Sequence, residues 1–131
     1  MKKRDVFAPL LLAAFVLLGS TVVSAQWRTL GSETVSGRGD TDTIGVTALR
    51  GDFRRIKLKV TGGPVRFLRI TITYGNGTTQ PVLVRALIRN GGETRAINLV
   101  GNERIIRKVD FWYSRASLDG KRPRVTLYGR D

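Results

Sequence analysis

Apolar and polar residues alternate along most of the chain after residue 25, and this period of two most constrains the fold. In residues 54–60, RRIKLKV, every second residue is aliphatic and the residues between are basic. The aliphatic residues are Ile56, Leu58 and Val60, and the basic residues are Arg55, Lys57 and Lys59. Successive side chains of a β-strand point to opposite faces, so we expect a strand with one face in the core and one in water.

Residues 65–74, VRFLRITITY, predict a second strand that contains an irregularity. In a regular strand one face would carry Leu68, Ile70, Ile72 and Tyr74. That parity leaves the aromatic Phe67 on the polar face, so we expect a β-bulge near Phe67 and Leu68, where one extra residue reverses the alternation. The following Gly75-Asn76-Gly77 predicts a hairpin turn, because Asn and Gly tolerate positive φ.

The remaining segments are also short and separated by turns. Turns are expected at Asn90-Gly91-Gly92 and Gly101-Asn102. Between residues 105 and 113, one parity carries Ile105, Val109, Phe111 and Tyr113, and the other carries Ile106 and Trp112. Further strands are expected within 27–35, 43–47 and 123–129. The pattern predicts an all-β fold, an antiparallel β-sandwich of seven to eight strands, with a small β-barrel as the alternative.

Residues 1–25 have the layout of a secretory signal peptide. A basic start, Lys2-Lys3-Arg4, precedes an apolar block, and Val23-Ser24-Ala25 supplies small residues for cleavage. We therefore expect cleavage after Ala25, a single domain over residues 26–131, and a periplasmic or extracellular location. No second long apolar run follows, so the mature chain is expected to lack a transmembrane segment.

Composition narrows the chemistry. The chain of 131 residues has 23 Lys and Arg against 10 Asp and Glu, and contains no Cys and no His. Removing the leader takes away three basic residues and one acidic residue, which leaves a net charge of +11. Strong positive charge favours anionic partners. Without thiol or imidazole groups, disulfides and most nucleophilic, metal-binding and proton-transfer chemistry are excluded, so we expect a protein that is not an enzyme and has no cofactor.

Two sets of short motifs resemble a known family. The first set is Trp27-x-x-Leu30-Gly31, Asp40-x-Asp42-x-Ile44 and Gly51-Asp52-Phe53-Arg54-Arg55-Ile56-Lys57-Leu58. The second is Tyr74-Gly75-Asn76-Gly77, Ile88-Arg89-x-Gly91-Gly92-x-Thr94-Arg95-x-Ile97-x-Leu99-x-Gly101 and Arg104-x-Ile106. The chain resembles an uncharacterised family of small exported bacterial β-rich proteins, a domain of unknown function. The resemblance implies a compact secreted β domain of the bacterial envelope and carries no established activity.

The basic residues of the strands are the candidate binding residues. Arg55, Lys57 and Lys59 form a ladder on the face opposite the core, and we expect two further arginines to extend it across neighbouring strands. Arginine offers paired donors in one plane, which suit phosphate and carboxylate. The predicted polyanion-binding face is Arg55, Lys57, Lys59, Arg69 and Arg85. The alternative is a solvated face that keeps the domain soluble and its strand edges unpaired.

We therefore expect a non-enzymatic envelope protein that docks on an anionic surface such as lipopolysaccharide, anionic lipid or acidic glycan. The alternative is a structural or protein-interaction domain with no specific ligand. A third hypothesis is a calcium-dependent adhesion module using Asp40 and Asp42, although Asp side chains also stabilise turns by binding nearby backbone N–H groups. Nucleic acid is disfavoured as a partner because the chain is predicted to be exported and lacks the known nucleic-acid motifs.

Overall fold

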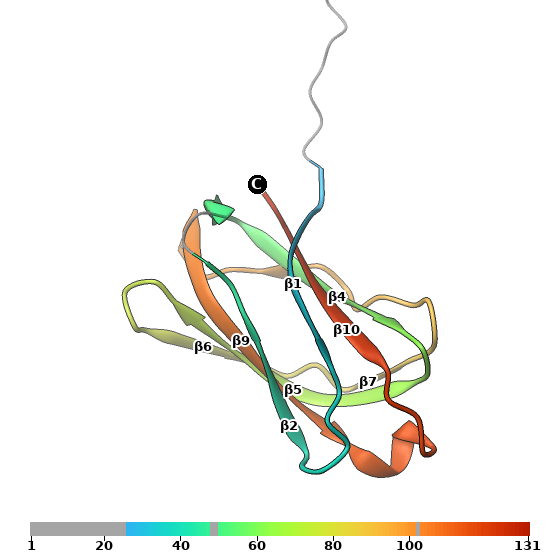
Figure 1. The fold of residues 1–131 in the computed structure, drawn as a ribbon. Coiled ribbons are helices and arrows are strands. Elements are labelled where there is room, and N and C mark those ends of the chain that lie inside the picture. The colour runs from blue at the N-terminus through green and yellow to red at the C-terminus, as the bar shows by residue number, and fades with distance from the viewer. Residues whose placement is uncertain (1–25, 48–49, 102) are drawn as a thin grey trace, which may run out of the picture.

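The described residues, 26–47, 50–101 and 103–131 of the computed structural model, form two antiparallel sheets that enclose one core (Figure 1). The predicted leader, residues 1–25, lies outside the described residues. The strands are β1 (Arg28–Thr34), β2 (Thr41–Gly45), β3 (Asp52–Phe53), β4 (Arg55–Thr61), β5 (Val65–Tyr74), β6 (Thr79–Val82), β7 (Ala86–Ile88), β8 (Ile97–Asn98), β9 (Arg104–Ser114) and β10 (Arg124–Arg130). A 3₁₀-helix, η3 (Arg115–Leu118), follows β9.

Strand order confirms the predicted sandwich. The first sheet has the order β1-β10-β4-β8, and the second has the order β2-β9-β5-β6, with β3 paired to β9 and β7 paired to β5. The sheets do not close into a barrel. The described residues contain more strands than the seven to eight expected, because β3, β7 and β8 are pieces of only two or three residues. The chain passes from the first sheet to the second between β4 and β5.

The alternation places the aliphatic residues of β4 and β10 in the core. Ile56, Leu58 and Val60 are fully buried, as are Val125 and Leu127 opposite them. From the second sheet, Phe67, Phe111 and Tyr113 are also fully buried. The rings of Phe67 and Phe111 meet edge to face with centroids 5.8 Å apart, a favourable geometry for aromatic pairs.

Two bulges change which side chains reach this core. Beside β9, the pairing of β5 skips one residue between Phe67 and Arg69, so the predicted bulge is confirmed. The skipped residue is Leu68, which is exposed, so its predicted place among the core residues is wrong. A second irregularity lies where Tyr74 pairs with Ile106 and Thr73 with Lys108. It turns Ile106 inward and Ile105 outward, the reverse of the predicted parity.

Two of the predicted glycine turns form as expected, and the third, at Gly101-Asn102, includes a residue outside the described ones. Gly77 has φ of +89° and its N–H donates to the Tyr74 carbonyl at 2.9 Å, which closes the hairpin between β5 and β6. The Asn76 side chain accepts from the Thr78 N–H at 3.1 Å. Gly91, with φ of +87°, joins the second predicted turn to β4 through a hydrogen bond from its N–H to the Val60 carbonyl at 2.7 Å.

Two buried tyrosines should make the fold less stable at alkaline pH. Burial is the main cause that raises the pKa of Tyr74 and Tyr113 above the ordinary tyrosine value of 10.0. A group whose pKa is higher in the folded state than in the unfolded state contributes its full stabilisation below the pKa of the unfolded state. This contribution is lost as the pH rises through the pKa of the folded state. We expect melting temperature to fall above pH about 10, and to fall less steeply in a Tyr74→Phe/Tyr113→Phe variant. Parallel pH profiles for the two proteins, measured by circular dichroism, would contradict this account.

In the part of the chain that the structure describes, we find no helix with the length and hydropathy of a membrane span.

Candidate functional site

The five predicted binding residues do not share one face. Arg55, Lys57 and Lys59 lie on β4 in the first sheet, where their side chains point away from the core as predicted. Arg69 lies on β5 in the second sheet, and Arg85 follows β6. The expectation that they form a single surface is therefore wrong. The strands are consecutive in the chain, but the crossover between β4 and β5 puts them in opposite sheets.

The basic ladder of β4 is largely occupied within the first sheet. Lys57 Nζ lies 2.9 Å from Glu93 Oε1 and 4.4 Å from the centre of the Trp27 ring. Arg55 Nε donates to Asn98 Oδ1 at 3.1 Å, across the β4–β8 pair. An acidic partner and an aromatic ring relieve the repulsion that stacked like charges would cause. These contacts hold β4 to its neighbours. The charge of Lys57 is paired with a carboxylate, whereas Arg55 bonds to a neutral amide and Lys59 forms no ion pair among the described residues.

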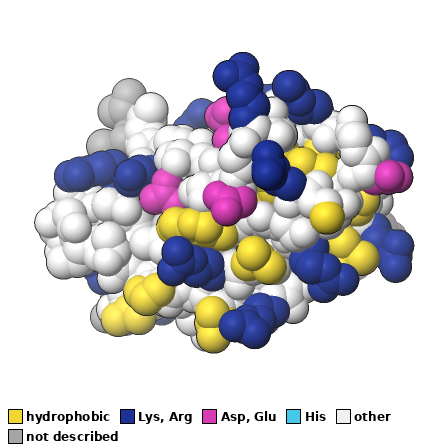
Figure 2. Space-filling view, turned by 90° about the horizontal axis from the view of Figure 1, so that it is seen from below, with side chains coloured by type: hydrophobic (Ala, Val, Ile, Leu, Met, Phe, Trp, Pro, Cys, Tyr) yellow, Lys and Arg dark blue, Asp and Glu magenta, His cyan; other side chains and the backbone are white. Residues whose placement is uncertain are grey.

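A different group of basic residues gathers on the second sheet. We call it the arginine–leucine patch and define it as Arg66, Leu68, Arg69, Leu83, Arg85 and Trp112. All but Trp112 line, with Phe67, a hollow of about 440 Å³. Figure 2 shows a face of the molecule on which hydrophobic side chains lie between Lys and Arg side chains, with Asp and Glu side chains also on this face. The patch therefore combines positive charge with exposed apolar surface.

The bulge in β5 builds half of this patch. The pairing skips Leu68, so the side chains of Arg66 and Arg69 both point to the outer face of the sheet. On β9, Ser114 lies opposite Arg66 and Trp112 lies opposite Arg69. The Arg69 guanidinium carbon lies 4.0 Å from the centre of the Trp112 ring, a cation–π contact. Leu68 is 43% exposed, although Phe67 beside it is fully buried.

The segment between β6 and β7 builds the other half. Val84 is buried and anchors this segment in the core. Its neighbours therefore point outward, with Leu83 at 64% exposure and Arg85 also exposed. The pairing of β7 with β5 opposite Val65 to Phe67 brings this segment beside the bulge.

The arginines of the patch have no acidic partners. Among the residues that the structure describes, no ion pair involves Arg66, Arg69 or Arg85. Asp110, two residues from Trp112 along β9, is engaged instead by Lys108 at 3.7 Å and by the Thr43 hydroxyl. Three guanidinium groups thus lie around one hollow with their charge uncompensated.

Sequence reasoning found Arg69, Arg85 and the outward Trp112 but missed Arg66 and the two leucines. The signal was present in the bulge itself. Once one residue is skipped at Leu68, the spacing of three between Arg66 and Arg69 places both on the same face. Leu83 alternates with the buried Val84, but alternation alone does not show whether the face opposite the core is open or covered by another element.

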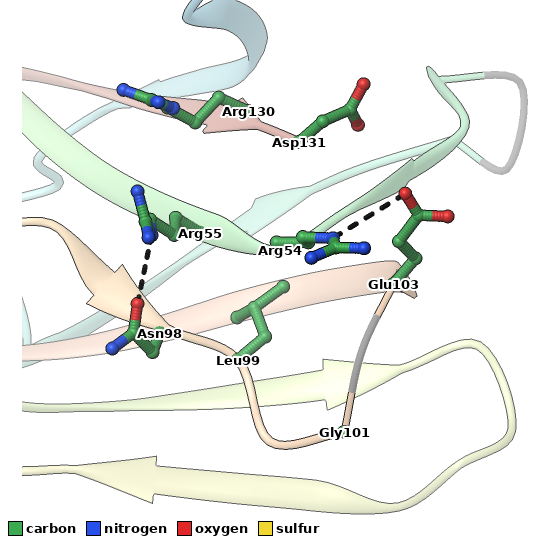
Figure 3. Close-up of a pocket in the computed structure, with 8 residues that line it drawn as sticks. All are labelled: Arg54, Arg55, Asn98, Leu99, Gly101, Glu103, Arg130 and Asp131. Carbon is green, nitrogen blue, oxygen red and sulfur yellow. Dashed lines mark hydrogen bonds and ion pairs between the residues drawn. The ribbon is translucent and has the colours of Figure 1, made fainter. Parts of the chain in front are cut away.

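A second hollow, of about 630 Å³, lies at the ends of β4, β8 and β10 (Figure 3). It is lined by Arg54, Arg55, Asn98, Leu99, Gly101, Glu103, Arg130 and Asp131. Its three arginines lie beside two carboxylates, those of Glu103 and Asp131, and Arg54 Nε lies 3.7 Å from Glu103 Oε2. Mixed charge gives this hollow no clear preference for an anion.

The acidic residues of the described chain that could hold a metal form one exposed group. Asp52, Glu103 and Asp131 can bring carboxylate oxygens within 4.8 Å of one another, and all three are exposed. In the described residues neither Asp40 nor Asp42 belongs to such a group. Asp42 Oδ2 instead accepts from the Ser36 N–H at 3.0 Å and from the Tyr113 hydroxyl at 2.8 Å. Its role in the fold is therefore to hold the loop before β2 against β9.

Fold and surface together define a small antiparallel β-sandwich that bears a hollow lined by three arginines and two exposed leucines. The chain belongs to the family described as Domain of unknown function (DUF2541), whose model matches residues 10–129. This confirms the family resemblance expected from the sequence motifs. No curated protein and no solved structure matches the chain.

Proposed function

We propose that this protein is a non-enzymatic, exported protein of the bacterial envelope that docks on anionic surfaces. The arginine–leucine patch is the docking surface, and its ligands carry phosphate or carboxylate groups, as lipopolysaccharide, anionic lipids and acidic glycans do. The single observation that carries the proposal is the presence of three arginines around one hollow without acidic partners. Four other basic residues of the described surface, Arg54, Lys57, Lys108 and Lys121, each lie within 4.0 Å of a carboxylate. The patch differs from the other arginines without an ion pair because its three arginines gather around one hollow with exposed leucines.

The chemistry of the patch supports this ligand class. A guanidinium group binds phosphate or carboxylate through two parallel hydrogen bonds, and such charge-assisted bonds are stronger than neutral ones. The excess of basic residues in the chain adds a long-range attraction that increases the rate of encounter with an anionic surface. Charge uncompensated within the fold is available to a ligand without breaking an internal pair.

The second candidate is a structural or protein-interaction domain without a specific ligand. The first sheet favours it, because Lys57 is bonded to Glu93, in the segment before β8, and Arg55 is bonded to Asn98 of β8. For that face, basic residues serve the fold rather than a ligand.

The proposed function is tested with the exported protein. The full chain is expressed with its own leader and purified from the exported fraction, and its mass shows whether residues 1–25 have been removed. Binding is measured on heparin and on vesicles of phosphatidylcholine with and without phosphatidylglycerol. We expect retention on heparin and on the anionic vesicles, no binding to neutral vesicles, and release at about 1 M salt, where the screening length is ~3 Å. Absence of binding to every anionic matrix would refute the proposal.

A further inference from the structure

The arginine–leucine patch also indicates which anionic surface it fits. Building on the proposed function, we propose that it docks on a lipid bilayer that carries phosphate-bearing anionic lipids. Leu68 and Leu83 enter the boundary between headgroups and acyl chains. Arg66, Arg69 and Arg85 bind the lipid phosphates around them.

The leucines carry the distinction between a bilayer and a soluble polyanion. Leu68 is 43% exposed and Leu83 is 64% exposed, and both line the hollow that the arginines surround. A soluble glycan offers charge but no apolar phase, so it leaves these side chains in water. A bilayer offers both, because interfacial segments bury an apolar face about 5–10 Å deep while their basic residues attract anionic lipids.

The leucines project from well-anchored backbone. Leu68 is the extra residue of the β5 bulge, and its neighbour Phe67 is fully buried. Leu83 adjoins Val84, which is 1% exposed. Each leucine is therefore held outward by a neighbour fixed in the core, and insertion requires no rearrangement of the fold.

Trp112 is suited to the same boundary. Trp side chains favour the membrane interface, where the ring is amphipathic. The Arg69 guanidinium stacks at 4.0 Å from the centre of the Trp112 ring, which orients its plane and leaves hydrogen-bond donors at its edge. The Trp112 ring thus lies against the arginine that, together with the two leucines, lines the hollow.

The test replaces both leucines in the full chain, purified after export as above. Leu68→Ser/Leu83→Ser is expected to bind phosphatidylglycerol-containing vesicles about tenfold more weakly than the unmodified protein, since fully burying one leucine is worth about 1.5–3 kcal/mol and these are only partly transferred. Its retention on heparin should not change. The matched control is Val100→Ser/Ile105→Ser, which removes two side chains of similar exposure, 62% and 45%, outside the patch. The control should bind vesicles as the unmodified protein does.

A spectroscopic readout locates the contact. In a Trp27→Phe background, Trp112 is the only remaining tryptophan of the chain after residue 25. Its emission is expected to shift to the blue with phosphatidylglycerol vesicles and to remain unshifted with heparin. Far-ultraviolet circular dichroism and melting temperature establish that each serine variant is folded.

Each result separates the inference from the proposed function. Vesicle binding that the leucine variant retains in full would overturn the inference and leave electrostatic docking intact. Retention on heparin without binding to anionic vesicles would assign the patch to an acidic glycan and also overturn it. An unmodified protein that binds neither heparin nor vesicles would overturn the proposed function itself.

Discussion

Replacing Arg66, Arg69 and Arg85 together by glutamine is expected to weaken binding to anionic vesicles about 100-fold. A basic residue near an anionic surface contributes about 1 kcal/mol, so three contribute about 3 kcal/mol, and each 1.4 kcal/mol corresponds to a tenfold change. Vesicle co-sedimentation over a range of lipid concentrations measures the change. Stability should be little affected, because these three side chains form no ion pair among the residues that the structure describes.

The matched control removes the same charge from the opposite sheet. Arg55→Gln/Lys59→Gln/Arg124→Gln changes three residues that point outward from β4 and β10. Each triple variant removes two residues of the predicted binding face, Arg55 and Lys59 in the control and Arg69 and Arg85 in the patch, so the pair compares the two sheets. We expect the control to lose less than about tenfold, through the reduced net charge alone. Equal losses for both triple variants would show that total charge rather than the patch governs binding.

Truncating two neighbouring isoleucines of β9 should destabilise the fold to very different degrees. Ile106 is 1% exposed and Ile105 is 45% exposed. Ile106→Ala is expected to lower the free energy of unfolding by about 2–5 kcal/mol, because it leaves a cavity in the core. Ile105→Ala is expected to cost less than about 1 kcal/mol, as substitutions at exposed sites do. Urea unfolding followed by fluorescence measures both.

This comparison also tests the second bulge. Strict alternation from Val109 predicts that Ile105 is the core residue, whereas the observed pairing of Ile106 with Tyr74 makes Ile106 the core residue. A larger loss for Ile105→Ala would show that β9 runs without the irregularity and that its register beyond Lys108 is wrong. The Gly75 turn would then also pack differently, since its N–H donates to the Ile105 carbonyl at 2.8 Å.

Alternation predicted the core residues best in strands that pair with their neighbours without a bulge. In β4, Ile56 and Leu58 are core residues as predicted, because an unbroken strand pairs over seven residues with β10. Leu68 and Ile105 were misplaced for the same physical reason. A single extra residue reverses the face of every residue beyond it, and where that residue is inserted depends on the partner strand. The sequence showed an irregularity at Phe67 but not which of two adjacent residues it would expel.

The sequence by itself determined that this chain forms short antiparallel strands around an aliphatic core, with hairpin turns at its glycines and a strong excess of arginine. These properties are local, since they depend on alternation and on residues that tolerate positive φ. Tertiary structure alone decided which arginines stand together. The crossover from β4 to β5 separated the predicted ladder from Arg69, and the bulge at Leu68 brought Arg66 beside it. A binding surface assembles from strands that pair over long sequence distances, and the pairing of sheets is not encoded in the period of any one strand.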